Sequence, residues 1–88
     1  MRRRSLVIDP KDNVAVLLEK AETRDSIEVN GTEIKLAEEI GFGHKAAIRD
    51  LKAEDPVYKY GEEIGYMLTD ISKGGWIHDH NMGCRRGK

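Results

Sequence analysis

Turn-forming residues interrupt this chain about every ten residues, and the apolar segments between them are short. Asn30-Gly31 is the strongest of these signals, because both residues readily adopt the positive φ angles of a type I′ hairpin turn. The flanking segments 26–29 and 33–36 alternate apolar and polar residues, which is the period of a half-buried strand. We therefore predict a β-hairpin centred on residues 30 and 31.

The other apolar segments predict a small all-β domain, with room for one or two short helices. Strands are expected over residues 6–8, 14–18, 57–60, 64–68 and 76–81, with a turn at 61–63. Residues 14–18 also fit a helix that continues through Ala21, and the segment after His44 has the same ambiguity. Short strands separated by turns favour a barrel or clip over an α/β fold. No internal repeat or low-complexity tract is evident.

We expect residues 1–88 to form a single domain, with flexible tails at 1–4 and 83–88. A domain of this size buries a thin core, which leaves little room for a deep cavity walled by its own side chains. Small-molecule sites often lie between domains. The length therefore favours a site that a partner completes, and a homo-oligomer is also left open.

The charge distribution argues against a nucleic-acid partner. The net charge is −1, but six of the 15 basic residues lie at the two ends, so the body holds nine basic and 16 acidic residues. An acidic body repels a phosphate backbone. No apolar run approaches the roughly 20 residues of a membrane helix, and the one after the N-terminal arginines is too short for a signal peptide. With Cys84 as the single cysteine, no internal disulfide forms. We expect a cytoplasmic protein without membrane contact.

His78-Asp79-His80 is the sharpest candidate for chemistry. On a strand, residues i and i+2 point to the same face, so both imidazoles would project together. Two neutral imidazoles suit a divalent metal ion that has further ligands, and one imidazole can instead exchange a proton near pH 7. Two surface histidines are the alternative interpretation. Cys84 fits either a further metal ligand or an ordinary thiol in a tail.

His44 follows the glycine-containing loop 41–43. Such a loop can direct backbone N–H groups at an anion, and His44 with Lys45 would add positive charge. A simple tight turn, with Lys45 in water, is the other interpretation and the one we favour from the residues alone. Tyr60 suits either a hydrogen bond to a ligand or packing.

Several short motifs occur in one order across residues 5–82: Asp12-Asn13-Val14, Gly43-His44-Lys45-Ala46, Val57-Tyr58-Lys59-Tyr60-Gly61, Ile64-Gly65 and His78-Asp79-His80-Asn81. Taken together, these motifs resemble the SAF-type domain that opens the altronate and galactarate dehydratases. The series is also similar to the small subunit of sulfolactate sulfo-lyase and of related two-chain lyases. The chain departs from the fused enzymes by ending at Lys88, without the large domain that follows in them.

The resemblance implies a SAF-type β-clip, a strand after His44, and lyase chemistry on sugar acids or sulfonated hydroxy acids. It implies a divalent metal, iron or manganese, and a large dehydratase subunit as partner. On this basis we expect His78 and His80 to handle the metal or a proton. We expect His44, Lys45, Lys59 and Tyr60 to bind the acid substrate. A non-catalytic carbohydrate- or protein-binding module, or an adaptor that lends no residue to the site, is the alternative function.

Overall fold

The computed structural model describes residues 1–84 and shows an all-β domain, with no helix in that range. The strands are β1 (Ser5–Leu6), β2 (Val14–Leu17), β3 (Ser26–Val29), β4 (Thr32–Lys35), β5 (Lys45–Ala47), β6 (Pro56–Lys59), β7 (Glu62–Met67), β8 (Trp76–Ile77) and β9 (Met82–Gly83). The expected all-β class is confirmed. The two segments that also fitted a helix are strands β2 and β5.

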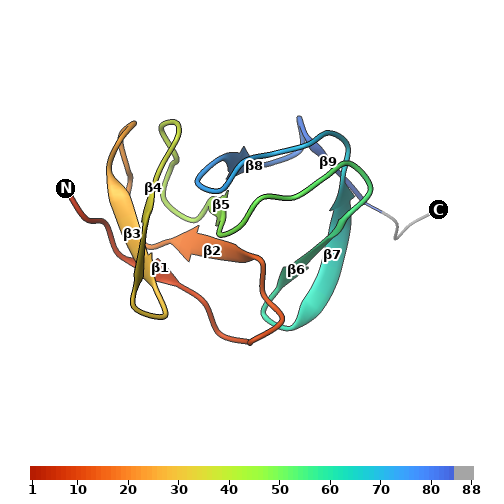
Figure 1. The fold of residues 1–88 in the computed structure, drawn as a ribbon, viewed down its shortest axis with the longest axis horizontal. Coiled ribbons are helices and arrows are strands. Elements are labelled where there is room, and N and C mark those ends of the chain that lie inside the picture. Colours follow the sequence, from red (N-terminus) through yellow and green to blue (C-terminus); the bar gives the residue numbers. More distant parts are fainter. Residues whose placement is uncertain (85–88) are drawn as a thin grey trace.

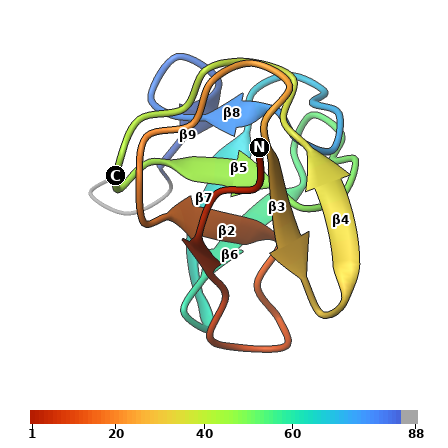
Figure 2. The same cartoon turned by 90° about the vertical axis from the view of Figure 1, so that its left-hand side faces the viewer.

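An antiparallel sheet with the order β1-β2-β5-β8 forms the middle of the domain. The hairpin β3–β4 lies at one end of the molecule, and β6–β7, extended by β9, lies at the other (Figure 1). Figure 2 shows β8, β5 and β2 stacked side by side behind the first hairpin. We call the β3–β4 hairpin with its flanking residues 21–40 the first ribbon, and the β6–β7 hairpin with its flanking residues 51–71 the second ribbon. The arrangement of these two ribbons around a short sheet is consistent with the SAF-type β-clip.

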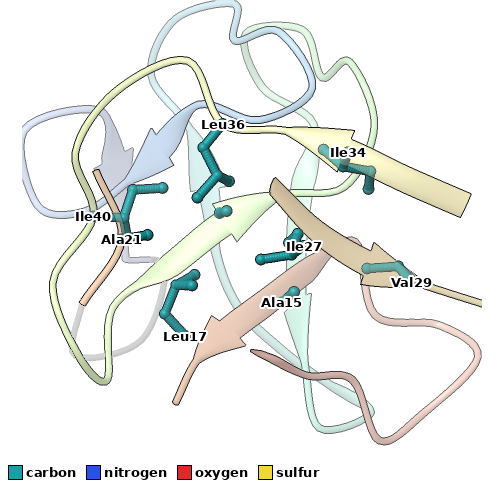
Figure 3. Packing of buried hydrophobic residues seen from close by; sticks show 9 residues of the cluster. Ala15, Leu17, Ala21, Ile27, Val29, Ile34, Leu36 and Ile40 are labelled. Atoms are coloured by element: carbon teal, nitrogen blue, oxygen red, sulfur yellow. The ribbon is translucent and has the colours of Figure 1, made fainter. Parts of the chain in front are cut away.

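The central strand β2 is buried on both faces, which explains its continuous apolar sequence. Ala15 and Leu17 face the first hairpin, whereas Val14 faces the second. The first cluster is shown in Figure 3 and contains Ala15, Leu17, Ala21, Ile27, Val29, Ile34, Leu36, Ile40 and Ala46. The second cluster contains Val14, Ala47, Leu51, Val57, Met67 and Ile77. Both ribbons are thus anchored on one sheet.

The predicted hairpin at Asn30-Gly31 is confirmed, with φ angles of 52° and 81° at the two turn residues. The second hairpin turns in the same way at Tyr60 and Gly61, with φ angles of 57° and 82°. The expected turn at 61–63 was therefore placed too late, because Glu62 already belongs to β7. A tyrosine in the left-handed region is uncommon, and sequence patterns give little sign of it.

The two ribbons make corresponding backbone hydrogen bonds, so the expectation of no internal repeat was wrong. Ala21 and Ile40 exchange two backbone hydrogen bonds. Leu51 and Ile71 exchange the same two. Other matching positions are Arg24 and Glu54 at positive φ, Asp25 and Asp55, Gly31 and Gly61, and Gly43 and Gly74. Three of these four pairs are identical residues, but nearby matching positions differ, such as Thr23 and Ala53 or Ser26 and Pro56, which explains why the repeat was not predicted from the sequence.

The strands that follow the two ribbons, β5 and β8, pair with each other. Lys45 lies opposite Ile77, and Ala46 lies opposite Trp76. Each of these strands follows one of the two ribbons. Lys45 of β5 corresponds to Trp76 of β8, and Ala46 of β5 corresponds to Ile77 of β8. The register is therefore the one that an approximate twofold axis between β5 and β8 would give.

Residues 1–4 are held in place, contrary to the expected tail. The N–H of Arg3 donates to the Ser26 carbonyl, and the Ser26 N–H donates to the Met1 carbonyl. The Arg3 guanidinium also bonds the Asp25 carboxylate at 2.8 Å. At the other end Gly83 belongs to β9 and Cys84 is exposed, and the rest of the second expected tail lies outside the described residues. No helix long and apolar enough to cross a membrane occurs in residues 1–84.

Candidate functional site

Three imidazole rings surround the indole of Trp76. The ring of His78 stacks on it at 5.3 Å between centroids with an interplanar angle of 14°. The rings of His80 and His44 lie at 4.8 and 5.6 Å in tilted orientations. His44 and His78 also contact each other, at 4.8 Å between centroids. Side chains from two distant parts of the sequence therefore form one cluster, which we call the Trp76 cluster (His44, Trp76, His78 and His80).

Strand β8 presents Trp76 in a fixed position. Its pairing with β5 places Trp76 opposite Ala46, and the Trp76 N–H donates to a carboxylate oxygen of Glu38 at 3.0 Å. The Trp76 carbonyl accepts a hydrogen bond from the side-chain amide of Asn81 at 2.9 Å. The half-buried indole also packs against the first core cluster. Backbone and side chain of Trp76 are thus both restrained.

Residues 78–81 form a turn, so the expected strand over 76–81 ends at Ile77. The buried Asn81 stabilises this turn, because its side-chain oxygen accepts the His78 N–H at 2.9 Å. The Asn81 N–H donates in turn to the His78 carbonyl at 3.0 Å. The strand geometry invoked for His78 and His80 was therefore wrong. Both rings still contact Trp76, with His78 half-buried and His80 exposed.

The loop before His44 is a tight turn packed on β2. Gly43 has a φ angle of 80° and donates its N–H to the Leu17 carbonyl. The His44 N–H donates to the Gly41 carbonyl, and the His44 carbonyl accepts the Leu17 N–H. These backbone groups are occupied within the chain, which supports the tight-turn interpretation over backbone binding of an anion. The loop's contribution is to deliver the His44 ring to Trp76.

The side chains of His44 and Trp76 are directly bonded. The indole N–H of Trp76 donates to Nδ1 of His44 across 3.2 Å. This contact fixes which His44 nitrogen carries a lone pair.

Lys45 follows His44 on β5 and is half-buried, so the expectation that it points into water was wrong. Burial lowers the pKa of its ammonium group, the nearby positive charge of Lys59 lowers it further, and the carboxylate of Asp79 acts in the opposite direction. Lys45 thus interacts electrostatically with a residue of the 78–81 turn and with one of the second ribbon. A half-buried cation beside a second cation favours binding of an anion.

Tyr60 lies at the tip of the β6–β7 hairpin, on the opposite side of the molecule from β8 (Figures 1 and 2). The Lys59 ammonium lies 5.2 Å from the centroid of its ring. The structure therefore brings Lys45 and Lys59 into electrostatic contact and places the Tyr60 turn away from the Trp76 cluster. A substrate contact by Lys59 or Tyr60 stays a prediction.

The Asp12-Asn13 motif has a structural role. Burial opposes ionisation of the Asp12 carboxyl, but backbone hydrogen bonds from Gly61, Asp9 and Ile8 outweigh it and lower its pKa. Asn13 bonds the backbone of β6 on both sides of Val57. This motif ties the loop before β2 to the second hairpin and is separate from the Trp76 cluster.

The arrangement of these motifs matches a known family. The model of the altronate/galactarate dehydratase SAF domain covers residues 3–85. The chain belongs to this family.

Curated relatives of this SAF domain are lyases. Altronate dehydratase of Bacillus subtilis (strain 168) is 36% identical over 74 residues, which are 84% of this chain and 15% of that protein. Galactarate dehydratase (L-threo-forming) of Escherichia coli (strain K12) is 39% identical over 77% of this chain and 13% of that protein. The subunit alpha of (2R)-sulfolactate sulfo-lyase of Paracoccus pantotrophus is 48% identical over 48 residues, 54% of this chain and 72% of that subunit. The chain thus spans a small part of the dehydratases.

Neither Trp76 nor the bonding role of Asn81 in this SAF domain was predicted from the sequence. Trp76 is the single tryptophan and lies two residues before His78, a spacing that could have drawn attention to it. Its contact with His44 could not have been read, because it depends on the long-range pairing of β5 with β8.

The donor set of the SAF domain does not by itself fit a metal ion. Within residues 1–84 no three side chains of His, Cys, Asp or Glu are grouped so that they could hold one. A zinc-type site takes four ligands, and the harder divalent cations take six or more. His78 and His80 can therefore be only part of a ligand set.

Proposed function

We propose that this SAF domain works with a large catalytic part of a sugar-acid dehydratase or sulfo-lyase, present as a separate subunit or as the remainder of a longer chain. The enzyme removes water from a hexonic or hexaric acid, or sulfite from a sulfonated hydroxy acid. The relatives named above support the reaction class. The observation that carries the proposal is the meeting of His44 and His78 on Trp76, because a packing module needs no such cluster. Cytoplasmic location is part of the proposal.

The reaction breaks a C–H bond next to the carboxylate and a C–O bond at the next carbon. The proton passes to a base, the hydroxyl leaves with a proton as water, and the enol that remains rearranges to a 2-keto-3-deoxy acid. Histidine suits the proton transfers because its charge changes near neutral pH. We assign them to His78 and His80, and we assign binding of the acid group to His44 and Lys45.

We propose that the divalent metal of the assembled enzyme takes most of its ligands from outside residues 1–84. A bound divalent cation supplies electrostatic stabilisation of a carboxylate and of the enolate that develops beside it. His78 or His80 would add an imidazole nitrogen to that set. His44 and Lys45 would bind and orient the acid group.

Replacement of His78 or His80 by Ala in the assembled enzyme tests the proposal. A lost general acid or base costs about 10²–10⁴-fold in turnover, and we expect losses in this range with assembly intact. Thr32→Ala, on the exposed tip of the first hairpin, is the matched control and should leave turnover unchanged. Wild-type turnover in both histidine variants would remove the proposed site.

A binding module or adaptor is the second candidate function, and the exposed Phe42 would supply its contact with the partner. Phe42 is 71% exposed and lies two residues before His44, where the large catalytic part would cover it. Phe42→Ser should weaken association with that part under either function. Normal turnover in the histidine variants, together with lost assembly in Phe42→Ser, would favour the adaptor.

A further inference from the structure

The hydrogen bond between Trp76 and His44 determines the protonation of the His44 ring. An indole nitrogen is a donor only, so Nδ1 of His44 must accept with a lone pair. A neutral imidazole then carries its proton on Nε2. His44 therefore presents an N–H group, and not a lone pair, at its other nitrogen.

The Trp76 indole, which donates this hydrogen bond, cannot rotate freely when the His44 ring changes its orientation. Trp76 is held by Glu38 at its N–H and by Asn81 at its carbonyl. Its ring lies flat against His78. Because Trp76 is restrained on the backbone and on the ring, the His44 ring has to adapt to it.

The Nε2 edge of His44 faces a glycine. A Cβ atom at Gly41 would lie 3.4 Å from Cδ2 and 3.8 Å from Nε2 of His44. These are ordinary contact distances, so alanine would fit there but would cover part of the edge. Glycine leaves more of the Nε2–H open to a ligand.

We propose that Trp76 is a positioning residue that holds His44 as the neutral Nε2–H tautomer, so that His44 binds an oxygen of the acid substrate as a hydrogen-bond donor. In this state the lone pair of His44 is used by Trp76, so His44 neither takes a proton from the substrate nor binds a metal ion. Within residues 1–84, the ring nitrogens of His78 and His80 have no hydrogen-bond partner, so proton exchange falls to these two. That the Nε2–H group of His44 binds the acid substrate rests on the proposed function, whereas the tautomer of His44 does not.

Nitrogen-15 NMR of the 88-residue chain tests the tautomer directly. Long-range proton–nitrogen correlations at a pH where the ring is neutral should show a bare Nδ1 and a protonated Nε2 for His44. His44→Ala identifies the signals. Trp76→Phe keeps an aromatic ring and removes the N–H, and it should return His44 to a mixture of tautomers. A protonated Nδ1 or a mixture in the wild-type chain would overturn the inference, whatever the variant does.

Turnover of the assembled enzyme tests the donor role. Gln can place an amide N–H near the position of Nε2, whereas Asn reaches only the position of Nδ1. We expect His44→Gln to stay within about tenfold of wild type and His44→Asn to lose about 10²–10³-fold, the cost of one removed donor. Gly41→Ala should raise KM and leave the melting temperature unchanged. Equal losses in the Gln and Asn variants would overturn the donor role.

The failure of the inference and the failure of the proposed function give different results. If His44 has the other tautomer while His78→Ala still abolishes turnover, the inference fails and the proposed function stands. If the tautomer is as expected but no histidine variant changes turnover, the proposed function fails and takes the donor role with it.

Discussion

Asn13 and Tyr58 are joined by two hydrogen bonds that run in opposite directions. The Tyr58 N–H donates to the side-chain oxygen of Asn13 at 2.8 Å, and the Asn13 N–H donates to the Tyr58 carbonyl at 3.3 Å. The Asn13 amide also donates to the Pro56 carbonyl at 2.8 Å. One buried side chain thus replaces the strand pairing that would otherwise connect the loop before β2 with β6.

Asn13→Ala should destabilise the domain by about 2–3 kcal/mol, because it leaves the Tyr58 N–H and the Pro56 carbonyl unpaired in the interior. Urea unfolding measures the loss. Lys11→Ala, on the exposed side of the same loop, should change stability by less than about 0.5 kcal/mol. Equal effects of the two variants would show that the Asn13 bonds contribute nothing specific.

Two glycines at positive φ should differ in their tolerance of alanine. Gly31 has a φ angle of 81° and open space where a side chain would project, so Gly31→Ala should cost about 1–2 kcal/mol from backbone strain alone. Gly74, with φ of 92°, faces the Lys35 carbonyl, and a Cβ there would overlap its oxygen. Gly74→Ala should lose a further 1–3 kcal/mol or so through the clash. Urea unfolding of both variants checks this order, and equal losses would contradict it.

The Asp25 carboxylate should make the domain less stable in acid. The guanidinium of Arg3, followed by the backbone N–H of Glu22, lowers its pKa from 3.8 to about 2. A lowered pKa stabilises the fold above the pKa of the unfolded chain, and this contribution is lost as pH falls from about 4 to about 2. The melting temperature of wild type should drop more steeply over this window than that of Asp25→Asn. Parallel curves would contradict the assignment.

Binding of the acid substrate should weaken at alkaline pH when Lys45 loses its proton. Because burial and Lys59 lower the Lys45 pKa, this loss should begin at a lower pH than for an exposed lysine. In the assembled enzyme, Lys45→Arg should move the rise in KM to higher pH. Asp79→Asn removes the charge that favours the ammonium, and it should move the rise to lower pH. A common alkaline limb in all three enzymes would exclude Lys45 from binding.

Chelation should separate the SAF domain from the assembled enzyme. The isolated 88-residue chain should melt at the same temperature with and without EDTA, because its described residues do not form a ligand set. The assembled enzyme should lose turnover and recover it when iron or manganese is restored. A melting temperature that falls with EDTA would show that the chain binds a structural metal by itself.

Features of the fold that are determined by adjacent residues could be predicted from the sequence. Asn30-Gly31 sets its own turn, so the first hairpin was placed correctly. Tyr60 adopts the same left-handed conformation at the matching turn of the second ribbon, although tyrosine, unlike asparagine, is uncommon in that region. Tertiary structure made the difference there.

The candidate site could be predicted only in part. The histidines are evident in the sequence by their chemistry, but the contact between His78 and His44 depends on the pairing of β5 with β8. Asn81 turns the chain after β8, which no alternation of residues reveals. Long-range pairing and one buried amide therefore decide the geometry of the cluster.

The near-symmetry of the two ribbons separates the requirements of folding from those of chemistry. His44 corresponds to Gly75 in the other half, and His78 corresponds to Ala47. A chain of half this length that dimerised about the β5–β8 axis would rebuild the same scaffold but would have to carry identical residues at both positions. Because the two halves belong to one polypeptide, their sequences can differ. The Trp76 cluster can therefore form on one side of a nearly symmetric fold without a second copy on the other side.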